Sequence, residues 1–393
     1  MLPCRMVFVK LGSQLRQKEK NTTQKKIRMG KKYEIPAEEC EDEALLREQL
    51  SMSYVTENPD IPESQFPVPI LEQLLQDRTT GRNIIWATND YAELGEGYAF
   101  NDTIEVEKIT GVHEGVIKPR SEKAKAVQLA RSRDKAEVFT PSWVCNKQNN
   151  LIDNEWFGRS DVFNNENDDH TWTTNRKKIE FPDTEGKTWR DYVKKVRLEI
   201  TCGEAPYLTS RYDTVTGEVI EPFDRIGLLD RKFRVVFENY GPDTDPAKWY
   251  EWMNIALQSI YGYEWQGDNL LLARENVLSS YVRFYMMRFG KREFPLEAKM
   301  KEVIDIITWN IWQMDGLKGV VPCSCHDVVQ KDQQQDMFGD VVPQKILPCP
   351  ACKSGERRDM HLHTGIKCRI KDWDLAHDGK NKNELYFYKL ITR

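Results

Sequence analysis

The stretch of residues 198–208, which reads LEITCGEAPYL, restricts how this chain can fold more than any other. It follows a strand-like run (residues 192–197) and leads into a turn of small residues around Gly203. A glycine there lets the backbone approach a neighbour closely, and a strand that ends in such a turn is typical of the carboxyl edge of a parallel sheet, where nucleotide-like ligands bind. Gly203 is the only glycine of the stretch, so an ordinary strand-to-loop turn is the alternative interpretation.

Two later segments have a related form. Residues 260–265 read as a short strand that ends in an acid, Glu264, and a helix follows over residues 268–278. This order predicts the second turn of a βαβ unit, where an acid can accept hydrogen bonds from both hydroxyls of a ribose. A surface glutamate at a helix cap is the alternative interpretation. The third segment, residues 308–317, ends in Asp315-Gly316-Leu317.

The sequence around these turns predicts further elements. Pro141 ends a strand-like segment, and residues 144–152 read as a helix with Ser142 near its cap. Helical periodicity predicts a helix over residues 249–259. The other expectations are short strands within residues 84–110, a basic helix over 117–136 whose charges form a solvated face, a polar loop at 161–169, and an amphipathic helix or strand at 297–308.

With these turns in this order, the chain resembles the N6-adenine DNA methyltransferases of restriction-modification systems. Phe139-Thr140-Pro141 is similar to their Phe-Thr-Pro motif, and residues 199–208 are similar to their cofactor loop, roughly Asp-Pro-Ala-Cys-Gly-Ser-Gly-Ala-Phe-Leu. Their next motif is similar to Gly262-Tyr263-Glu264 with Ala273, Asn276 and Leu278, and Asp315-Gly316-Leu317 looks like their Asp-x-Leu. The chain most resembles proteins labelled restriction endonuclease subunit M, from about residue 70 to its end.

The resemblance implies a Rossmann-like α/β domain that binds S-adenosylmethionine and transfers a methyl group to adenine N6 in DNA, within a restriction or phage-defence system. Glu199 would face the methionine amino group of the cofactor, Glu264 would hold the ribose, and Asp315 would hold the adenine amine. The target adenine would leave the duplex and enter a pocket. The implied cofactor-binding residues are Phe139, Thr140, Pro141, Glu199, Thr201, Gly203, Ala205, Tyr207, Glu264, Trp265, Asp315 and Leu317.

The chain departs from this family at the catalytic motif. The family holds the flipped adenine with Asn/Asp-Pro-Pro-aromatic, and no Pro-Pro pair occurs here. Asn310 and Trp312 are the nearest surrogate for that catalytic pair. The catalytic half is therefore either reduced to this surrogate or supplied by a partner subunit, and a non-catalytic subunit that binds DNA or senses S-adenosylmethionine is the alternative function. An RNA or protein methyltransferase is a third class, because cofactor motifs do not identify the acceptor.

Five of the nine cysteines lie between residues 323 and 368. Cys349, Cys352, His363 and Cys368 form a C-x2-C-x10-H-x4-C set, which suits a tetrahedral structural zinc site without an open position for catalysis. Cys325 in place of His363 would make an all-cysteine site, and reduced thiols without metal are the remaining alternative. Basic residues around the set suit contact with DNA phosphates.

These interpretations predict four parts. They are a basic disordered leader (residues 1–32), an accessory region (33–130), the cofactor domain (131–320) and a zinc-ribbon-like module (321–393). The net charge of -5 argues against a protein that coats nucleic acid indiscriminately. No apolar run reaches the roughly 18 residues of a membrane span, and no signal peptide is recognisable, so we expect a cytoplasmic location without a membrane partner.

Overall fold

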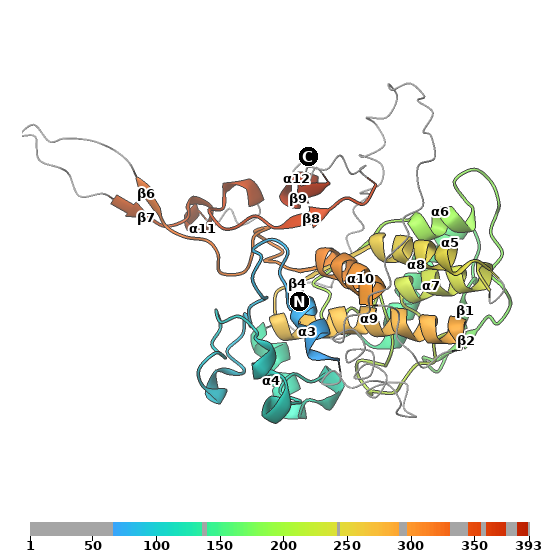
Figure 1. Ribbon diagram of the computed structural model, residues 1–393, viewed down its shortest axis with the longest axis horizontal. Coiled ribbons are helices and arrows are strands. Elements are labelled where there is room, and N and C mark those ends of the chain that lie inside the picture. Colours follow the sequence, from blue (N-terminus) through green and yellow to red (C-terminus); the bar gives the residue numbers. More distant parts are fainter. Residues whose placement is uncertain are drawn as a thin grey trace, which may run out of the picture.

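The fold is built on a three-stranded parallel sheet, whose middle strand, β4, is labelled in Figure 1. The computed structural model describes residues 66–135, 140–241, 244–290, 297–330, 345–354, 359–374 and 383–391; the predicted leader lies outside them. The strand order is β3-β4-β5, and Glu199 pairs with Gly262, which in turn pairs with Ile311. The strands are β3 (Arg197–Ile200), β4 (Ile260–Glu264) and β5 (Ile311–Gln313). The protein is therefore a mixed α/β protein with a parallel sheet, as the sequence predicts.

Two helices connect each pair of neighbouring strands. The predicted helix at residues 249–259 is confirmed, and it begins with Pro246 after Asp245, whose carboxylate accepts the N–H of Ala247. The helix after Glu264 is longer than predicted, and residues 297–308 form a helix rather than a strand. The connecting helices are α7 (Leu228–Asn239), α8 (Pro246–Gln258), α9 (Gly267–Phe289) and α10 (Glu297–Asn310).

Different parts of the chain cover the two faces of the sheet. Ile260 and Ile311 face the helices and belong to the larger buried cluster. Leu198, Tyr263 and Trp312 face the other way and pack in a second cluster with Phe387. The second face is thus closed by the C-terminal elements, which are β8 (Arg369–Lys371), β9 (Glu384–Tyr386) and α12 (Tyr388–Ile391). Residues on both sides of the predicted boundary at residue 320 therefore belong to one core.

The described part of the accessory region, residues 66–130, shares the core of the helical face. Helix α3 (Val68–Leu74) packs on α9 and α10, and the buried guanidinium of Arg274 donates to the carbonyls of Leu74, Gln76 and Ile311. The short strands predicted at residues 84–110 are reduced to one isolated bridge, Ile85 with Thr103, among 3-10 turns. The side-chain amide of Gln313, at the end of β5, exchanges two hydrogen bonds with the backbone of Ile85 (2.8 and 2.9 Å), as the backbone of a neighbouring strand would.

The basic helix begins at Lys125, later than predicted, and forms the predicted solvated face only in part, because Lys125 and Arg133 are exposed whereas Arg131 is buried. In α4 (Lys125–Lys135), the buried Arg131 lies 2.9 Å from Asp268, in the first turn of α9. Lys123 lies 3.4 Å from the same carboxylate. These ion pairs hold the pKa of Asp268 well below its usual value, against the opposing effect of burial. This part of the basic run therefore fixes α4 to the body of the protein.

Helix α5 (Ser142–Phe157) extends the predicted helix by about one turn beyond residue 152 and ends at Gly158 in the left-handed conformation. The predicted polar loop contains part of a hairpin, formed by β1 (Asn164–Glu166) and β2 (Trp172–Thr174). Asn164 is buried and exchanges hydrogen bonds with Asn146 of α5 (2.9 and 3.0 Å), so a tertiary network stabilises a strand with poor intrinsic propensity.

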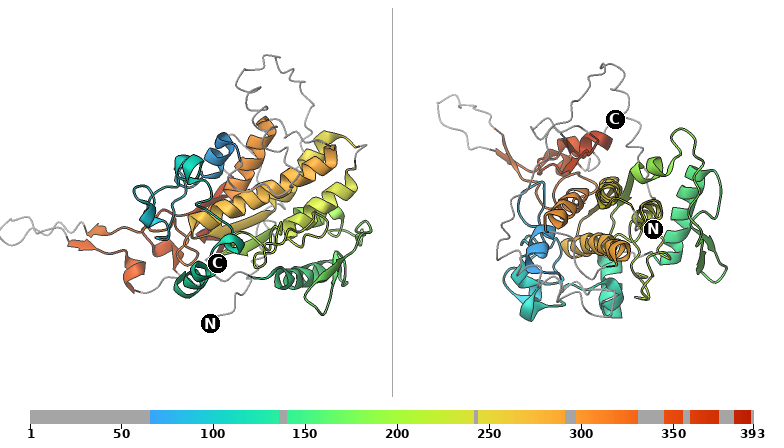
Figure 2. Two further views of the ribbon diagram at one scale, coloured as in Figure 1. Left: turned by 90° about the horizontal axis from the view of Figure 1, so that it is seen from below. Right: turned by 45° about the vertical axis from the view of Figure 1, so that its right-hand side comes forward.

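A smaller group of elements follows β5. A hairpin of β6 (Val328–Gln330) and β7 (Lys345–Leu347) projects from the body of the protein (Figures 1 and 2). It continues into α11 (Pro350–Ser354) and the 3-10 turn η7 (Met360–Leu362). None of the helices that the structure describes has both the length and the apolar surface needed to cross a membrane.

Candidate functional site

The carboxyl ends of β3 and β4 meet in a loop with an unusual backbone. Thr201, Gly203 and Ala205 all have positive φ (47°, 54° and 63°). This conformation is costly for a residue with a side chain, above all for a β-branched one, and such strain persists where the surrounding structure imposes it, often at binding sites. The strained residues lie within the stretch that the sequence singles out, and Thr201 is exposed.

The side chain of Glu199 holds this loop in place through two hydrogen bonds. Its side chain is buried, and its two carboxylate oxygens accept the backbone N–H groups of Tyr207 (3.4 Å) and Leu208 (3.2 Å). Burial raises the pKa of Glu199 well above its usual value, and the Glu264 carboxylate adds to this rise, although the two N–H donors oppose it. The carboxylate therefore fixes the far end of the loop, at the place where the resemblance puts an acid for the cofactor.

Glu264 joins the loop to the second strand. Its Oε2 accepts the N–H of Gly203 (2.8 Å) and its Oε1 accepts the N–H of Gln266 (3.2 Å). Burial raises its pKa, and the N–H donors again oppose the rise. Each carboxylate oxygen has a further lone pair, so the side chain can accept additional donors. Two buried acids with raised pKa at neighbouring strand ends are typical of functional sites.

The helix that opens with the Thr-Pro motif lies against the same loop. Thr140 precedes α5, and its carbonyl accepts the Thr214 hydroxyl (3.1 Å). The Asn149 amide of α5 donates to the carbonyl of Tyr207 (3.1 Å). Helix α5 therefore contacts the loop through Asn149, with Thr140 and Pro141 just before its first residue, while Phe139 lies outside the described residues.

The third strand end carries Asp315 in a tight turn. Asp315 Oδ1 accepts the N–H groups of Leu317 (3.0 Å) and Lys318 (3.2 Å), and Oδ2 lies 3.4 Å from the Lys318 ammonium. The Leu317 side chain is largely exposed. Trp265, after β4, donates its indole N–H to the carbonyl of Ala87 (3.1 Å). The predicted cofactor residues at the three strand ends therefore lie along one edge of the sheet.

The raised pKa of Glu199 predicts a pH-dependent stability. The Glu199 carboxyl ionises at a higher pH in the folded protein than in the unfolded chain. Its contribution to the free energy of unfolding is therefore fully present below the unfolded pKa of 4.5 and is lost as the pH rises through the folded pKa. Glu199→Gln does not ionise, so between these two pKa values its free energy of unfolding should rise, relative to that of the parent protein, by about 1.4 kcal/mol per pH unit. Thermal unfolding of both proteins between pH 4 and pH 8 checks this. A difference that does not change with pH would contradict it.

Asn310 and Trp312 do not lie at this edge. Asn310 ends α10 at the amino end of β5, where its amide donates to the carbonyls of Leu257 (2.9 Å) and Ile260 (2.8 Å) and accepts the Trp373 indole N–H (2.8 Å). Trp312 is buried in the second face of the sheet, against Phe387. This placement does not support the surrogate catalytic pair, because the amide is used by the backbone and the ring by the core.

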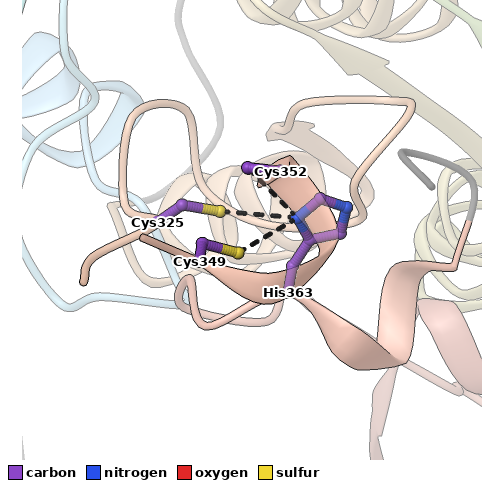
Figure 3. A group of neighbouring side chains, drawn as sticks. All are labelled: Cys325, Cys349, Cys352 and His363. Atoms are coloured by element: carbon purple, nitrogen blue, oxygen red, sulfur yellow. Dashed lines mark hydrogen bonds between the residues drawn. The ribbon is translucent and has the colours of Figure 1, made fainter. Parts of the chain in front are cut away.

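Four metal-binding side chains meet beside the Asp315 turn. Sγ of Cys325, Cys349 and Cys352 lie 3.7, 3.7 and 3.5 Å from Nδ1 of His363, and dashed lines in Figure 3 mark these three contacts. Nδ1 carries at most one N–H, so it cannot donate a hydrogen bond to all three sulfurs. A zinc ion with bonds of about 2.3 Å to sulfur and 2.0 Å to nitrogen separates these ligands by about 3.5 Å in a tetrahedron. The group therefore has the spacing of a site for a metal ion such as zinc.

The local structure explains why these four residues meet. Cys325 precedes β6 and Cys349 follows β7, so the hairpin brings them together. Cys352 lies one turn along α11, and His363 directly follows η7. The N–H of Thr364 donates to Cys349 Sγ (3.5 Å), as a backbone donor does around a bound thiolate.

Cys368 is not a member of this group, which corrects the set predicted from spacing. Its side chain is fully buried in the core of the second sheet face, and its thiol contacts the carbonyl of Gln313 (3.5 Å). Cys325 takes its place, together with His363 and not instead of it. The sequence signal for Cys325 is its position at one end of the hairpin whose other end carries the Cys-x2-Cys turn.

Comparisons with protein-family models, curated proteins and solved structures found no match to this chain.

Proposed function

We propose that this chain binds S-adenosylmethionine at the carboxyl edge of the sheet and serves as a component of a system that methylates adenine N6 in DNA. The observation that carries the proposal is the hydrogen bond between Glu264 at the end of β4 and Gly203 in the strained loop after β3 (2.8 Å). This bond joins the loop after β3 to the acid at the end of β4. In parallel-sheet proteins that bind nucleotides, such a loop lies against the ligand and such an acid accepts hydrogen bonds from its ribose.

The residues at this edge fit such a ligand. Glu264 would accept hydrogen bonds from the ribose hydroxyls, and Asp315 would accept one from the adenine amine beside the exposed Leu317. Glu199 would hold the loop in place by its bonds to Tyr207 and Leu208. When bound, S-adenosylmethionine supplies a methyl group on a sulfonium centre, and the task of this chain is to orient it.

A catalytically incomplete subunit that needs a partner is the second candidate function. Asn310 favours it, since both of its amide donors and its carbonyl are already engaged within the fold. In this case the chain supplies the methyl donor site, and a second polypeptide supplies the groups that hold the flipped adenine. The metal site would serve as a structural zinc site in either function, because four protein ligands leave no open position.

Glu264→Gln tests the ligand site directly. The variant keeps the shape of the side chain but loses the charge that strengthens its bonds to hydroxyl donors, so we expect the Kd for S-adenosylmethionine to rise by roughly 10- to 100-fold, which corresponds to about 1.5–3 kcal/mol. Calorimetric titration of the purified protein measures it. Glu155→Gln is the matched control, because Glu155 is exposed on α5.

The same preparation separates the two functions. Labelled methyl transfer to DNA of mixed sequence by the chain alone would support the self-sufficient enzyme. Ligand binding without transfer would support the incomplete subunit. If the parent protein does not bind S-adenosylmethionine at all, both functions are wrong.

A further inference from the structure

The metal-ligand group and the turn that carries Asp315 are joined by an unbroken set of contacts. We propose that binding of a metal ion by Cys325, Cys349, Cys352 and His363 orders the turn of residues 315–319 and thereby controls the affinity of the strand edge for its nucleoside ligand. The ordering of the turn is a property of this fold. Its effect on affinity rests on the proposed function.

The turn is held from outside by the metal-binding segments. The N–H of Asp315 donates to the carbonyl of Val320, and the N–H of Cys368 donates to the carbonyl of Gly319 (2.8 and 3.1 Å). Gly319 has φ of +66°, and a Cβ built on it would lie 2.8 Å from Sδ of Met360, in the 3-10 turn next to His363. The turn therefore packs directly against the residues that position a metal ligand.

Two chain segments carry the connection from the ligands to the turn, and they are paired along their length. The N–H of Val321 donates to the carbonyl of Ile366 (2.8 Å), and Val320 bridges Lys367. Further along, the Thr364 hydroxyl donates to the carbonyl of His326 (2.7 Å). Cys325 precedes His326 and His363 precedes Thr364, so a metal ion bound by both ligands closes the open end of this paired ladder.

The outer part of the ladder, beyond Cys323, has little else to hold it together. Val320 and Val321 at its inner end are buried, but among the described residues between Cys323 and Lys367 the buried apolar side chains are those of Cys349, Ala351 and Met360. A segment with so small a core depends on its metal for folding, because the site does not exist in the unfolded chain and binding energy becomes folding energy. Loss of the metal is therefore expected to open the outer part of the ladder and to loosen the pairing next to residues 315–319.

Hydrogen exchange measures the ordering without any ligand. We compare the zinc-loaded protein with protein stripped by a chelator, and follow the amides of Asp315, Gly319 and Cys368. Stripping is expected to accelerate their exchange at least tenfold, while the amides of α9 stay protected. Unchanged exchange at these three amides would overturn the proposal.

A variant breaks the same connection from the side of the turn. Gly319→Ala adds a Cβ against Met360 and leaves all four metal ligands in place. We expect it to bind one zinc per chain, to exchange faster at the turn, and to bind S-adenosylmethionine on the order of tenfold more weakly. Gly290→Ala is the matched control, since Gly290 has a similar φ of +60° and no atom within 4 Å of the added Cβ.

Calorimetry with S-adenosylmethionine separates this proposal from the proposed function. Equal affinity in loaded and stripped protein would overturn the coupling and leave the ligand site intact. If the loaded protein does not bind S-adenosylmethionine, the proposed function and the effect on affinity both fail, and exchange at the turn alone decides whether the metal orders it.

Discussion

Cys349→Ser is expected to reduce the zinc content of the purified protein from one ion per chain to nearly none. Cys349 is the most buried of the three cysteines of the group, and it also accepts the N–H of Thr364. Serine is a poor zinc ligand, and three remaining ligands do not complete the tetrahedron of a structural site. Metal analysis gives the content, and thermal unfolding with and without a chelator gives the effect on stability.

The stability effect should be large and local. Structural zinc binds to small zinc-finger domains with about 10–16 kcal/mol, most of which appears as folding energy. We therefore expect Cys349→Ser to lose protection of β6, β7 and α11 while the helices around the parallel sheet keep theirs. The chelator should lower the unfolding temperature of the parent protein and have no effect on the variant.

Two serine variants serve as controls and also test which cysteines are ligands. Cys323 is exposed and lies two residues before Cys325 but outside the group, so Cys323→Ser should keep its zinc. Cys368→Ser should keep it as well, because Cys368 packs in the sheet core. Loss of zinc in Cys368→Ser together with retention in Cys325→Ser would show that the set based on sequence spacing is correct.

Arg231→Met is expected to lower the free energy of unfolding by about 3–5 kcal/mol, because it leaves a buried carboxylate without its ionic partner. Arg231 is 1% exposed, and its Nη1 lies 2.6 Å from Asp153 Oδ2. Its Nη2 donates to Asn146 (3.0 Å) and Asn150 (2.7 Å), so one guanidinium joins α7 to α5. Methionine keeps an unbranched apolar stem but has none of these donors.

Denaturant unfolding of the two proteins measures this cost. Arg176→Met is the matched control, since Arg176 is 64% exposed and pairs with Asp224 at the surface. Such pairs contribute about 0–1 kcal/mol. Equal midpoints for the two variants would show that the network around Arg231 does not stabilise the fold. Adding Asp153→Leu to Arg231→Met should recover part of the loss, because the unpaired charge is then gone.

Local patterns predicted the elements at the functional edge. The strand before Gly203 starts later than the strand-like run at residues 192–197, because Tyr192 lies in helix α6 (Trp189–Lys194) and β3 covers Arg197–Ile200. The strand after Ser259 is a short run rich in aromatic residues that ends at Glu264, as predicted. The hairpin at residues 164–174 was missed because Asn and Asp favour turns, and only the buried network with α5 makes a strand of them. The inward position of Arg131 was missed for a similar reason, since its partner Asp268 is 137 residues away in sequence.

The ligand set shows the limit of spacing as a signal. Spacing identified Cys349, Cys352 and His363 correctly as members of the group, because they lie close together in sequence. Spacing could not choose between Cys325 and Cys368. Cys325 reaches the site because the β6–β7 hairpin folds back, and Cys368 is absent from it because its side chain packs in the sheet core. The role of Asn310 likewise follows from the carbonyls of two distant residues, Leu257 and Ile260.

The closing of one sheet face by residues 369–391 has a consequence for the synthesis of the protein. Ribosomes make the chain from its amino end, so Leu198, Tyr263 and Trp312 are all present before Ile370 and Phe387 have been made. During that interval the apolar face has no cover and is prone to associate with other nascent chains. Premature termination before residue 369 would make this exposure permanent, and such fragments should be recovered as aggregates or digested peptides.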